Sequence, residues 1–233
     1  DVLGSRGLGD VYKRQVKYMS KANKSNKAIK YRLYPNNEQK VMFAKTFGCC
    51  RFVYNQLLAL QKQRYKDGKS HLSKLKSNEF ATRTLKKDYD FLKEIDKFAV
   101  SNAVFHLADA YDRFFKKQNH FPKFKSKRKS KKSYTTNFTN NNILIGKNVI
   151  KLPKVGMVKA VIHKLPKDDW KLKSVTVSQD SVGNYFASVL FEYEQEDIPS
   201  VSKSSTNAIG LDYKSDGLYM DLSLIHISEP TRP

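Results

Sequence analysis

The acidic side chain best placed to do chemistry is Asp212. It follows an apolar run at 208–211, and a Ser-Asp-Gly turn at 215–217 leads into a second apolar run at 218–220. Two such runs around a turn predict a hairpin with Asp212 on its first strand. An unpaired carboxylate in an apolar setting is costly, and a divalent cation is one way to offset that cost. Asp212 is therefore predicted to be a catalytic metal ligand, and a surface acid beside a turn is the alternative.

A second candidate is the segment 116–132, which carries nine basic residues and no acidic one. Phe121 and Phe124 lie inside it. Cations neutralise phosphates and aromatic faces stack on bases or anchor a loop, so the pattern favours a polynucleotide groove over a solvated loop. Such contacts go mainly to the backbone and position a polynucleotide without reading its sequence. The predicted binding residues are Lys116, Lys117, Lys123, Lys125, Lys127, Arg128, Lys129, Lys131 and Lys132.

Arg51, Tyr54 and Asn55 form a third candidate on a predicted helix. An exposed arginine and asparagine can hydrogen-bond to base edges in a major groove, so these three are also predicted to contact nucleic acid. The alternative is a helix that packs through Phe52 and Tyr54 and leaves Arg51 in solvent.

The composition favours the same class of partner. The 233 residues include 44 Lys+Arg against 22 Asp+Glu, a formal charge of +22. Such a surplus repels itself unless a polyanion neutralises it, so nucleic acid is the leading partner and an anionic membrane surface is the rival. The apolar runs are too short to cross a bilayer and no signal peptide is visible, so no membrane partner is expected. No small-molecule substrate is expected either.

The cysteines and histidines offer no metal site. Cys49 and Cys50 are adjacent in a helical pattern, which predicts buried thiols and suits a reducing cytoplasm. No zinc site is expected in this chain, because the remaining candidate ligands lack metal-ligand spacing: His71, His106, His120 and His163.

Periodicity predicts an α+β fold. Residues 28–34 alternate as a strand, and Asn37 is the expected N-cap of a helix to about residue 66. Gly48 is expected to mark a break or a tight helix crossing. Helical patterns over 71–85 and 96–117 complete a bundle. Five short strands then predict a small barrel or sandwich, at 142–145, 149–152, 157–163, 171–178 and 185–194.

The two ends of the chain differ from the rest. Residues 1–18 and 223–233 share no periodicity with their neighbours. Both resemble translated sequencing-adapter read-through, so they are expected to be foreign to the fold. Residues 196–207 are rich in serine and are predicted to be a linker.

Several motifs together resemble a known family. In order they are IKYRLYP at 29–35, FGCCRFVYN at 47–55, FPKFKSK at 121–127, LPKVG at 152–156, SVTVS at 174–178 and IGLD at 209–212. Each motif is weak alone, but their order is specific. The segment from about residue 19 to 221 resembles the TnpB/OrfB proteins of bacterial insertion sequences, which are related to type V CRISPR effectors.

The resemblance implies an RNA-guided DNA endonuclease of the transposase-associated type, located in the bacterial cytoplasm and associated with the nucleoid. It implies a helical recognition lobe at 37–118 inserted into a wedge-like β-barrel, which the strand at 28–36 and the basic loop and strands at 119–195 would form. A ribonuclease H-like RuvC domain would begin at 208–222. A guide RNA would pair with double-stranded target DNA while the protein holds the backbone. Asp212 would be the first acid of an Mg²⁺ site.

The chain departs from the family pattern at its catalytic end. The other two acids of the Mg²⁺ site and the four-cysteine Zn²⁺ ribbon fall beyond residue 233. Two-metal cleavage needs several carboxylates, so we expect this N-terminal fragment to be inactive. A stand-alone, non-enzymatic RNA- or DNA-binding protein is the alternative.

Overall fold

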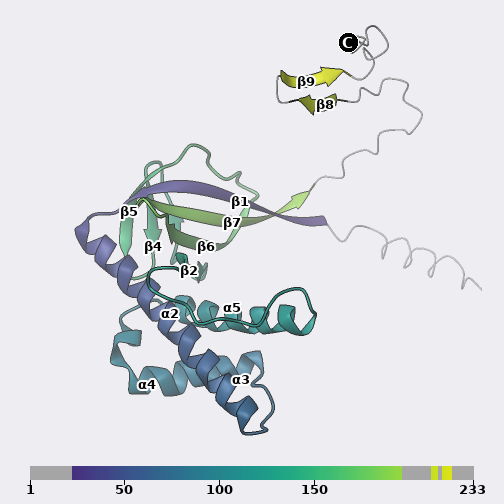
Figure 1. Cartoon of the computed structure of the whole chain (residues 1–233). Coiled ribbons are helices and arrows are strands. Elements are labelled where there is room, and N and C mark those ends of the chain that lie inside the picture. Colours follow the sequence, from purple (N-terminus) through teal and green to yellow (C-terminus); the bar gives the residue numbers. More distant parts are fainter. Residues whose placement is uncertain (1–22, 196–210, 215–216, 222–233) are drawn as a thin grey trace, which may run out of the picture. The chain divides into compact units, whose positions relative to one another are not determined.

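The computed structural model describes residues 23–195, 211–214 and 217–221. It has an α+β architecture in which a helical region lies, along the chain, between the first and second strands of an antiparallel sheet (Figure 1). The chain divides into two units after Gln195. The predicted leader at 1–18, linker at 196–207 and tail at 223–233 lie outside the described residues.

The sheet has seven strands in the order β2-β6-β7-β1-β5-β4-β3. Strand β1 is central and pairs antiparallel with β7 along its length, with Leu33 opposite Tyr185. Alternation explains its register, because Ile29, Tyr31 and Leu33 are buried while Lys30 and Tyr34 are exposed. The strands are β1 (Asn23–Tyr34), β2 (Lys132–Asn137), β3 (Leu144–Ile145), β4 (Val149–Leu152), β5 (Gly156–Val161), β6 (Lys171–Gln179) and β7 (Tyr185–Gln195).

The predicted barrel does not close, because the sheet is open and β2 and β3 are its edges. Alternation along a strand selects the buried face, but closure depends on whether the first and last strands pair, which alternation does not encode. Strand β2 was absent from the prediction because its sequence is mostly polar. It is held by Tyr134 and Thr136, which are buried, and the Thr136 hydroxyl donates to the Asp96 carboxylate at 2.6 Å.

Helix α2 (Asn37–Lys66) is the longest element of the helical region. Its N-cap is Asn36 instead of the predicted Asn37, because the Asn36 side chain accepts from the Gln39 amide at 2.8 Å. The Gln39 side chain accepts in return from the Asn36 amide at 3.1 Å, which completes a capping box. The predicted break at Gly48 is wrong. Gly48 lies inside an uninterrupted helix, and no atom beyond its chain neighbours and the adjacent helix backbone lies within 4 Å of the position a Cβ would take, so there is no tight helix crossing there either.

The predicted helix at 71–85 is composite. It consists of α3 (Lys74–Glu79), a π-helical turn η1 (Phe80–Leu85) and α4 (Lys86–Asp88), followed by a 3₁₀ turn η2 (Asp90–Lys93). Helix α5 (Lys97–Phe115) confirms the helix predicted at 96–117. Helices and sheet share one hydrophobic core: Phe43 of α2 contacts Tyr134 of β2 and Tyr185 of β7.

The second unit contains a hairpin of β8 (Leu211–Lys214) and β9 (Gly217–Asp221). The two strands pair antiparallel, as the predicted hairpin requires, and Asp212 lies opposite Met220. Its place in a ribonuclease H-like domain stays a prediction. None of the helices in residues 23–195 combines the length and apolar character that a membrane crossing requires.

Candidate nucleic-acid interface

The segment 116–132, hereafter the basic loop, leaves α5 through a tight helix end. The amide of Lys117 bonds to the Phe114 carbonyl at 2.9 Å, and the amide of Gln118 bonds to the Arg113 carbonyl at 2.9 Å. Lys117 takes a left-handed conformation, with φ of 57°, that turns the chain off the helix axis. The loop then returns along α2 and enters β2 at Lys132.

Asn55 of α2 fixes the middle of the basic loop. Its side-chain amide donates to the Lys125 carbonyl at 2.9 Å and accepts from the Lys125 amide at 2.8 Å. The amide thereby satisfies one backbone donor and one backbone acceptor that would otherwise need water. Lys125 also places its ammonium 4.0 Å from the centroid of the Tyr54 ring. These contacts hold the loop against α2.

Serines shape the exposed tip of the basic loop. The Ser126 amide donates to the Ser130 hydroxyl at 2.9 Å, and the Lys129 amide donates to the Ser126 hydroxyl at 2.9 Å. Such local side-chain bonds define a turn without regular secondary structure. They hold Lys127, Arg128 and Lys129 at an exposed turn.

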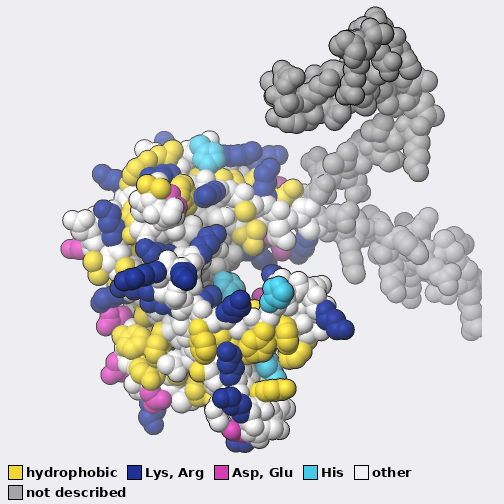
Figure 2. All heavy atoms as spheres, viewed as in Figure 1, with side chains coloured by type: hydrophobic (Ala, Val, Ile, Leu, Met, Phe, Trp, Pro, Cys, Tyr) yellow, Lys and Arg dark blue, Asp and Glu magenta, His cyan; other side chains and the backbone are white. Residues whose placement is uncertain are grey.

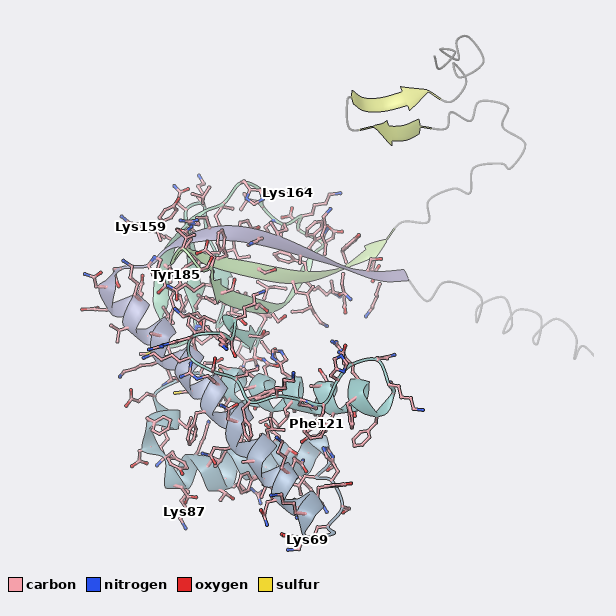
Figure 3. All side chains as sticks on the ribbon, in the orientation of Figure 1. Lys69, Lys87, Phe121, Lys159, Lys164 and Tyr185 are labelled. Carbon is pink, nitrogen blue, oxygen red and sulfur yellow. The ribbon has the colours of Figure 1, made fainter. Side chains whose placement is uncertain are left out.

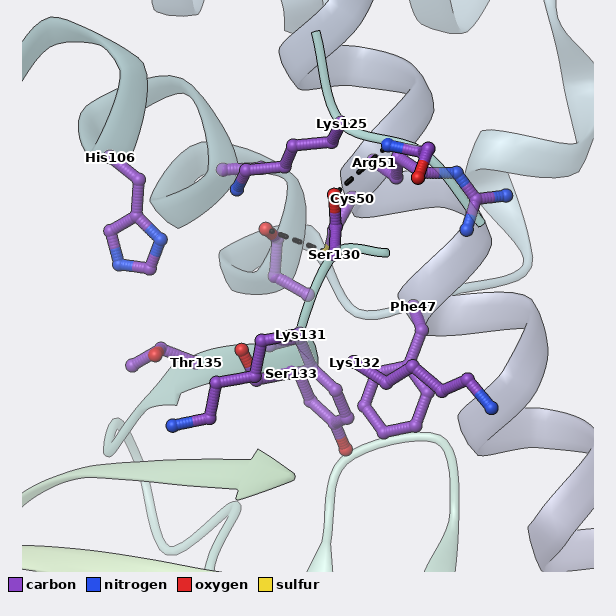
Figure 4. A pocket seen from close by; sticks show the side chains of 14 residues that line it. Phe47, Cys50, Arg51, His106, Lys125, Ser130, Lys131, Lys132, Ser133 and Thr135 are labelled. Carbon is purple, nitrogen blue, oxygen red and sulfur yellow. Dashed lines mark hydrogen bonds between the residues drawn. The ribbon is translucent and has the colours of Figure 1, made fainter. Parts of the chain in front are cut away.

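The basic loop, α2, α5 and β2 enclose a small polar recess of about 40 Å³ (Figure 4). Its cations are Arg51, Lys125, Lys131 and Lys132, and no acidic residue is among its lining residues. Burial lowers the pKa of Lys125. Burial, followed by the nearby Lys125 charge, lowers the pKa of His106. Burial therefore disfavours positive charge on these two side chains, and a bound anion would offset that cost.

The cations of the basic loop are free of acidic partners. Within residues 23–195, none of the nine forms a salt bridge. All but Lys125 are exposed. In Figure 2, Lys and Arg side chains gather in the band between the sheet and the helices. An array of unneutralised cations on a fixed loop is the arrangement that a polyphosphate backbone requires.

The three predicted contacts on α2 divide into two kinds. Arg51 is half-buried and lines the recess, where it stays available to an anion. Tyr54 is only 6% exposed, and the Asn55 amide is engaged by Lys125, so the structure gives both an anchoring role. Their contact with nucleic acid stays a prediction.

Three further residues of the recess were not predicted from the sequence: Ser126, Ser130 and His106. Serines inside a basic run are a recognisable sign of a shaped turn, so the two serines could have been found. His106 carries no such sign, because its place beside Lys125 arises only when α5 packs against the basic loop.

Asp212 lies in β8, next to an irregularity in the pairing with β9 between residues 212 and 214. Its side chain is outside what the structure describes. Among the described residues, no group of three or more His, Cys, Asp or Glu side chains could hold a metal ion. Those residues therefore do not fit a complete two-metal site, and the roles of Asp212, Mg²⁺ and Zn²⁺ stay predictions.

A strongly basic α+β protein with an unneutralised cationic loop is the class that this fold and surface define, and comparison with known proteins makes it more specific. Residues 25–70 match the helix-turn-helix domain model of OrfB proteins from IS605-type elements. In this chain the matched residues hold part of β1 and the single helix α2.

Curated relatives extend the match. The chain is 30% identical over 188 residues to a Streptomyces pristinaespiralis protein named "Putative RNA-guided DNA endonuclease", covering 80% of this chain and 45% of that protein. It is 29% identical over 192 residues to "Putative RNA-guided DNA endonuclease InsQ" of Escherichia coli K12, covering 79% and 44%. It is also 34% identical over 113 residues to virulence protein VsdF of Salmonella dublin, covering 43% and 93%.

These matches and the ordered motifs place the chain in the OrfB/TnpB family of insertion-sequence proteins. The chain spans a little under half the length of the two relatives named as endonucleases.

Proposed function

We propose that the chain is the N-terminal part of a transposon-encoded, RNA-guided, metal-dependent DNA endonuclease. In this proposal residues 37–118 form a recognition lobe, and the surface around the basic loop binds guide RNA and double-stranded target DNA. The similarity to two proteins named as RNA-guided DNA endonucleases supports it over about four-fifths of the chain. The observation that carries it is the set of nine cations without acidic partners on a loop that Asn55 holds against α2.

The cations of the basic loop are expected to contact phosphates, so binding should depend steeply on salt. About 6–10 phosphate contacts would lose roughly 10³–10⁵ in affinity between ~50 and ~200 mM salt. The assay is fluorescence anisotropy of the full chain with labelled double-stranded DNA and structured RNA across a salt series. A shallow slope would argue against this surface.

A matched pair of triple variants separates the basic loop from net charge. Lys127→Ala, Arg128→Ala and Lys129→Ala together should weaken binding about equally for all sequences and flatten the salt slope by about 1 for each phosphate that is no longer neutralised. The control removes three exposed lysines away from the basic loop: Lys87 of α4, Lys159 of β5 and Lys164 of the loop that follows β5 (Figure 3). Equal effects from both variants would assign binding to overall charge and not to the loop.

Catalysis is proposed to belong to the whole protein and not to this chain. A bound Mg²⁺ pair would polarise the phosphodiester and activate water, and Asp212 would be one of its ligands. Several carboxylates are needed for that chemistry, so the chain should cleave nothing when supplied with Mg²⁺, guide RNA and target DNA. Cleavage that Asp212→Ala abolishes would show that the chain itself is an active nuclease.

A second candidate is a stand-alone nucleic-acid-binding protein without nuclease activity. One observation favours it: the match to VsdF spans only 113 residues yet covers 93% of that protein. The genomic sequence that follows the codon for residue 221 discriminates the two. Further acids and paired cysteines in the same reading frame support the endonuclease, and an immediate stop codon supports the stand-alone protein.

A further inference from the structure

A second feature lies at the far end of α2 from the sheet and is distinct from the recess. It is an open cleft of about 570 Å³, hereafter the aromatic cleft, between the end of α2, the end of α5 and the start of the basic loop. Its volume is within the roughly 300–1,000 Å³ range of ligand sites. Six of its lining residues are aromatic: Tyr65, His71, Tyr111, Phe114, Phe115 and Phe121.

Two of these rings are exposed to an unusual degree. Tyr65 is 86% exposed and Phe115 is 63% exposed. An apolar patch left in water on a domain that has a well-filled core marks a binding surface more often than chance. Figure 2 shows hydrophobic side chains gathered on the helical region, with Lys and Arg side chains among them.

The other rings pack against one another and against Phe115. The Tyr111 ring lies 4.7 Å from His71 and 5.6 Å from Phe121, edge to face in both cases, and is stacked on Phe115 at 6.2 Å. Tyr111 itself is buried. Burial also lowers the pKa of His71, which favours the neutral form of its ring. The aromatic cleft is therefore already formed before any ligand binds.

The rim of the cleft is positively charged. Lys62, Lys66 and Lys69 are among its lining residues, and no acidic residue is. The Lys62 ammonium lies 5.5 Å from the Phe121 centroid and 4.6 Å from the Phe124 centroid. Lys69 has an exposed acidic neighbour, Asp67, at 3.8 Å, a contact of little energetic weight at the surface.

We propose that the aromatic cleft binds an unstacked nucleobase from a single-stranded segment of polynucleotide. The base would lie against Tyr65 and Phe115, and its flanking phosphates would contact Lys66 and Lys69. Aromatic faces beside cations are the combination by which proteins hold single strands without reading sequence. An apolar peptide would also fit the rings, but the three lysines and the lack of lining acids favour a polyanion. This inference rests on the proposed nucleic-acid binding.

The test compares two probes of equal length and charge, a fluorescein-labelled oligouridylate and an abasic oligonucleotide, with the full chain. Tyr65→Ala and Phe115→Ala should each weaken oligouridylate binding roughly 5- to 100-fold and leave abasic binding unchanged. Phe115→Leu keeps an apolar contact with Tyr111 but removes the ring, so it guards against a folding defect. The control is Phe91→Ala, at a ring that is 42% exposed and does not line the cleft.

The outcomes separate this inference from the proposed function. If the parent chain binds neither these probes nor the double-stranded DNA and structured RNA of the salt series, nucleic-acid binding itself is wrong and the inference falls with it. If it binds the double-stranded DNA or structured RNA but not the oligouridylate, only the cleft proposal is overturned. If the parent binds both probes and the Tyr65 and Phe115 variants match it, the basic loop stands and the cleft proposal is overturned. Equal weakening of both probes also overturns it. An oligothymidylate arm then distinguishes RNA from DNA, and a 4-thiouridine cross-link to Tyr65 or Phe115 would locate the base directly.

Discussion

The anchoring of the basic loop by Asn55 can be tested by removing its side chain. Asn55→Ala leaves the amide and the carbonyl of Lys125 without the partners they have at 2.8 and 2.9 Å. Each of these hydrogen bonds is worth about 0.5–1.5 kcal/mol net, so the free energy of opening the loop should fall by roughly 1–3 kcal/mol. The opened population should therefore rise about 5- to 150-fold.

Amide hydrogen exchange at Lys125 and at the Ser126–Ser130 turn measures that population directly. Affinity for nucleic acid is a less sensitive readout, because it falls only by the fraction of molecules whose loop has left the binding conformation. Asn55→Asp keeps the acceptor for the Lys125 amide and loses the donor, so it should have an intermediate effect. The matched control is Asn102→Ala on α5, whose amide donates to the Thr135 carbonyl of β2 at 2.9 Å and not to the loop.

The reasoning fails if Asn55→Ala leaves exchange at Lys125 as slow as in the parent. It also fails if Asn102→Ala accelerates exchange at that position by the same factor, since the effect would then report global destabilisation. Urea unfolding of each variant supplies the global free energy against which the local change is judged.

Three further predictions concern stability and reactivity. Thr136→Val should lower the free energy of unfolding in urea by roughly 1.5–3 kcal/mol, because it removes the hydroxyl that donates to the nearly buried Asp96 carboxylate. Its control is Thr135→Val, which removes one hydroxyl of a half-buried hydroxyl pair and should lower that free energy by less. Asn36→Ala should lower the free energy of unfolding by about 0.5–2 kcal/mol through loss of the α2 cap. Asn36→Ser keeps a capping oxygen and should lose much less, so equal losses in the two variants would argue against the capping box. Burial raises the pKa of Cys50 to about 12 and also raises that of Cys49, so the folded chain should resist thiol reagents at mildly alkaline pH and react at both sites in urea. Rapid modification of the folded chain would contradict the burial of these thiols.

Periodicity predicted the helices and strands whose apolar side chains recur at a regular spacing. It failed where contacts with distant parts of the chain determine the local structure. The strand containing Ile29, Tyr31 and Leu33 and the helix α5 follow their patterns closely. Strand β2 escaped prediction because its serine and threonines carry little hydrophobic signal, and it is fixed instead by Tyr134 and by the bond from Thr136 to Asp96. At Gly48 the glycine suggested a break, but the rest of α2 propagates the helix through it.

The candidate site also has one part that the sequence predicts and another that only the folded structure reveals. The basic loop was predictable, because nine cations without an acid are visible in one dimension. The role of Asn55 was not, because its partner Lys125 is far away along the chain and the contact exists only after folding. The aromatic cleft was equally hidden, since its rings come from three separate segments.

The pairing of β1 with β7 has a consequence for synthesis on the ribosome. Strand β1 emerges first, yet most of its hydrogen-bonding partners belong to the last strand of the sheet. The helices between them rely on nearer contacts and can assemble earlier. A nascent chain halted before Tyr185 would therefore present the bare edge of β1 to its neighbours, a template for aggregation that only the completed unit conceals.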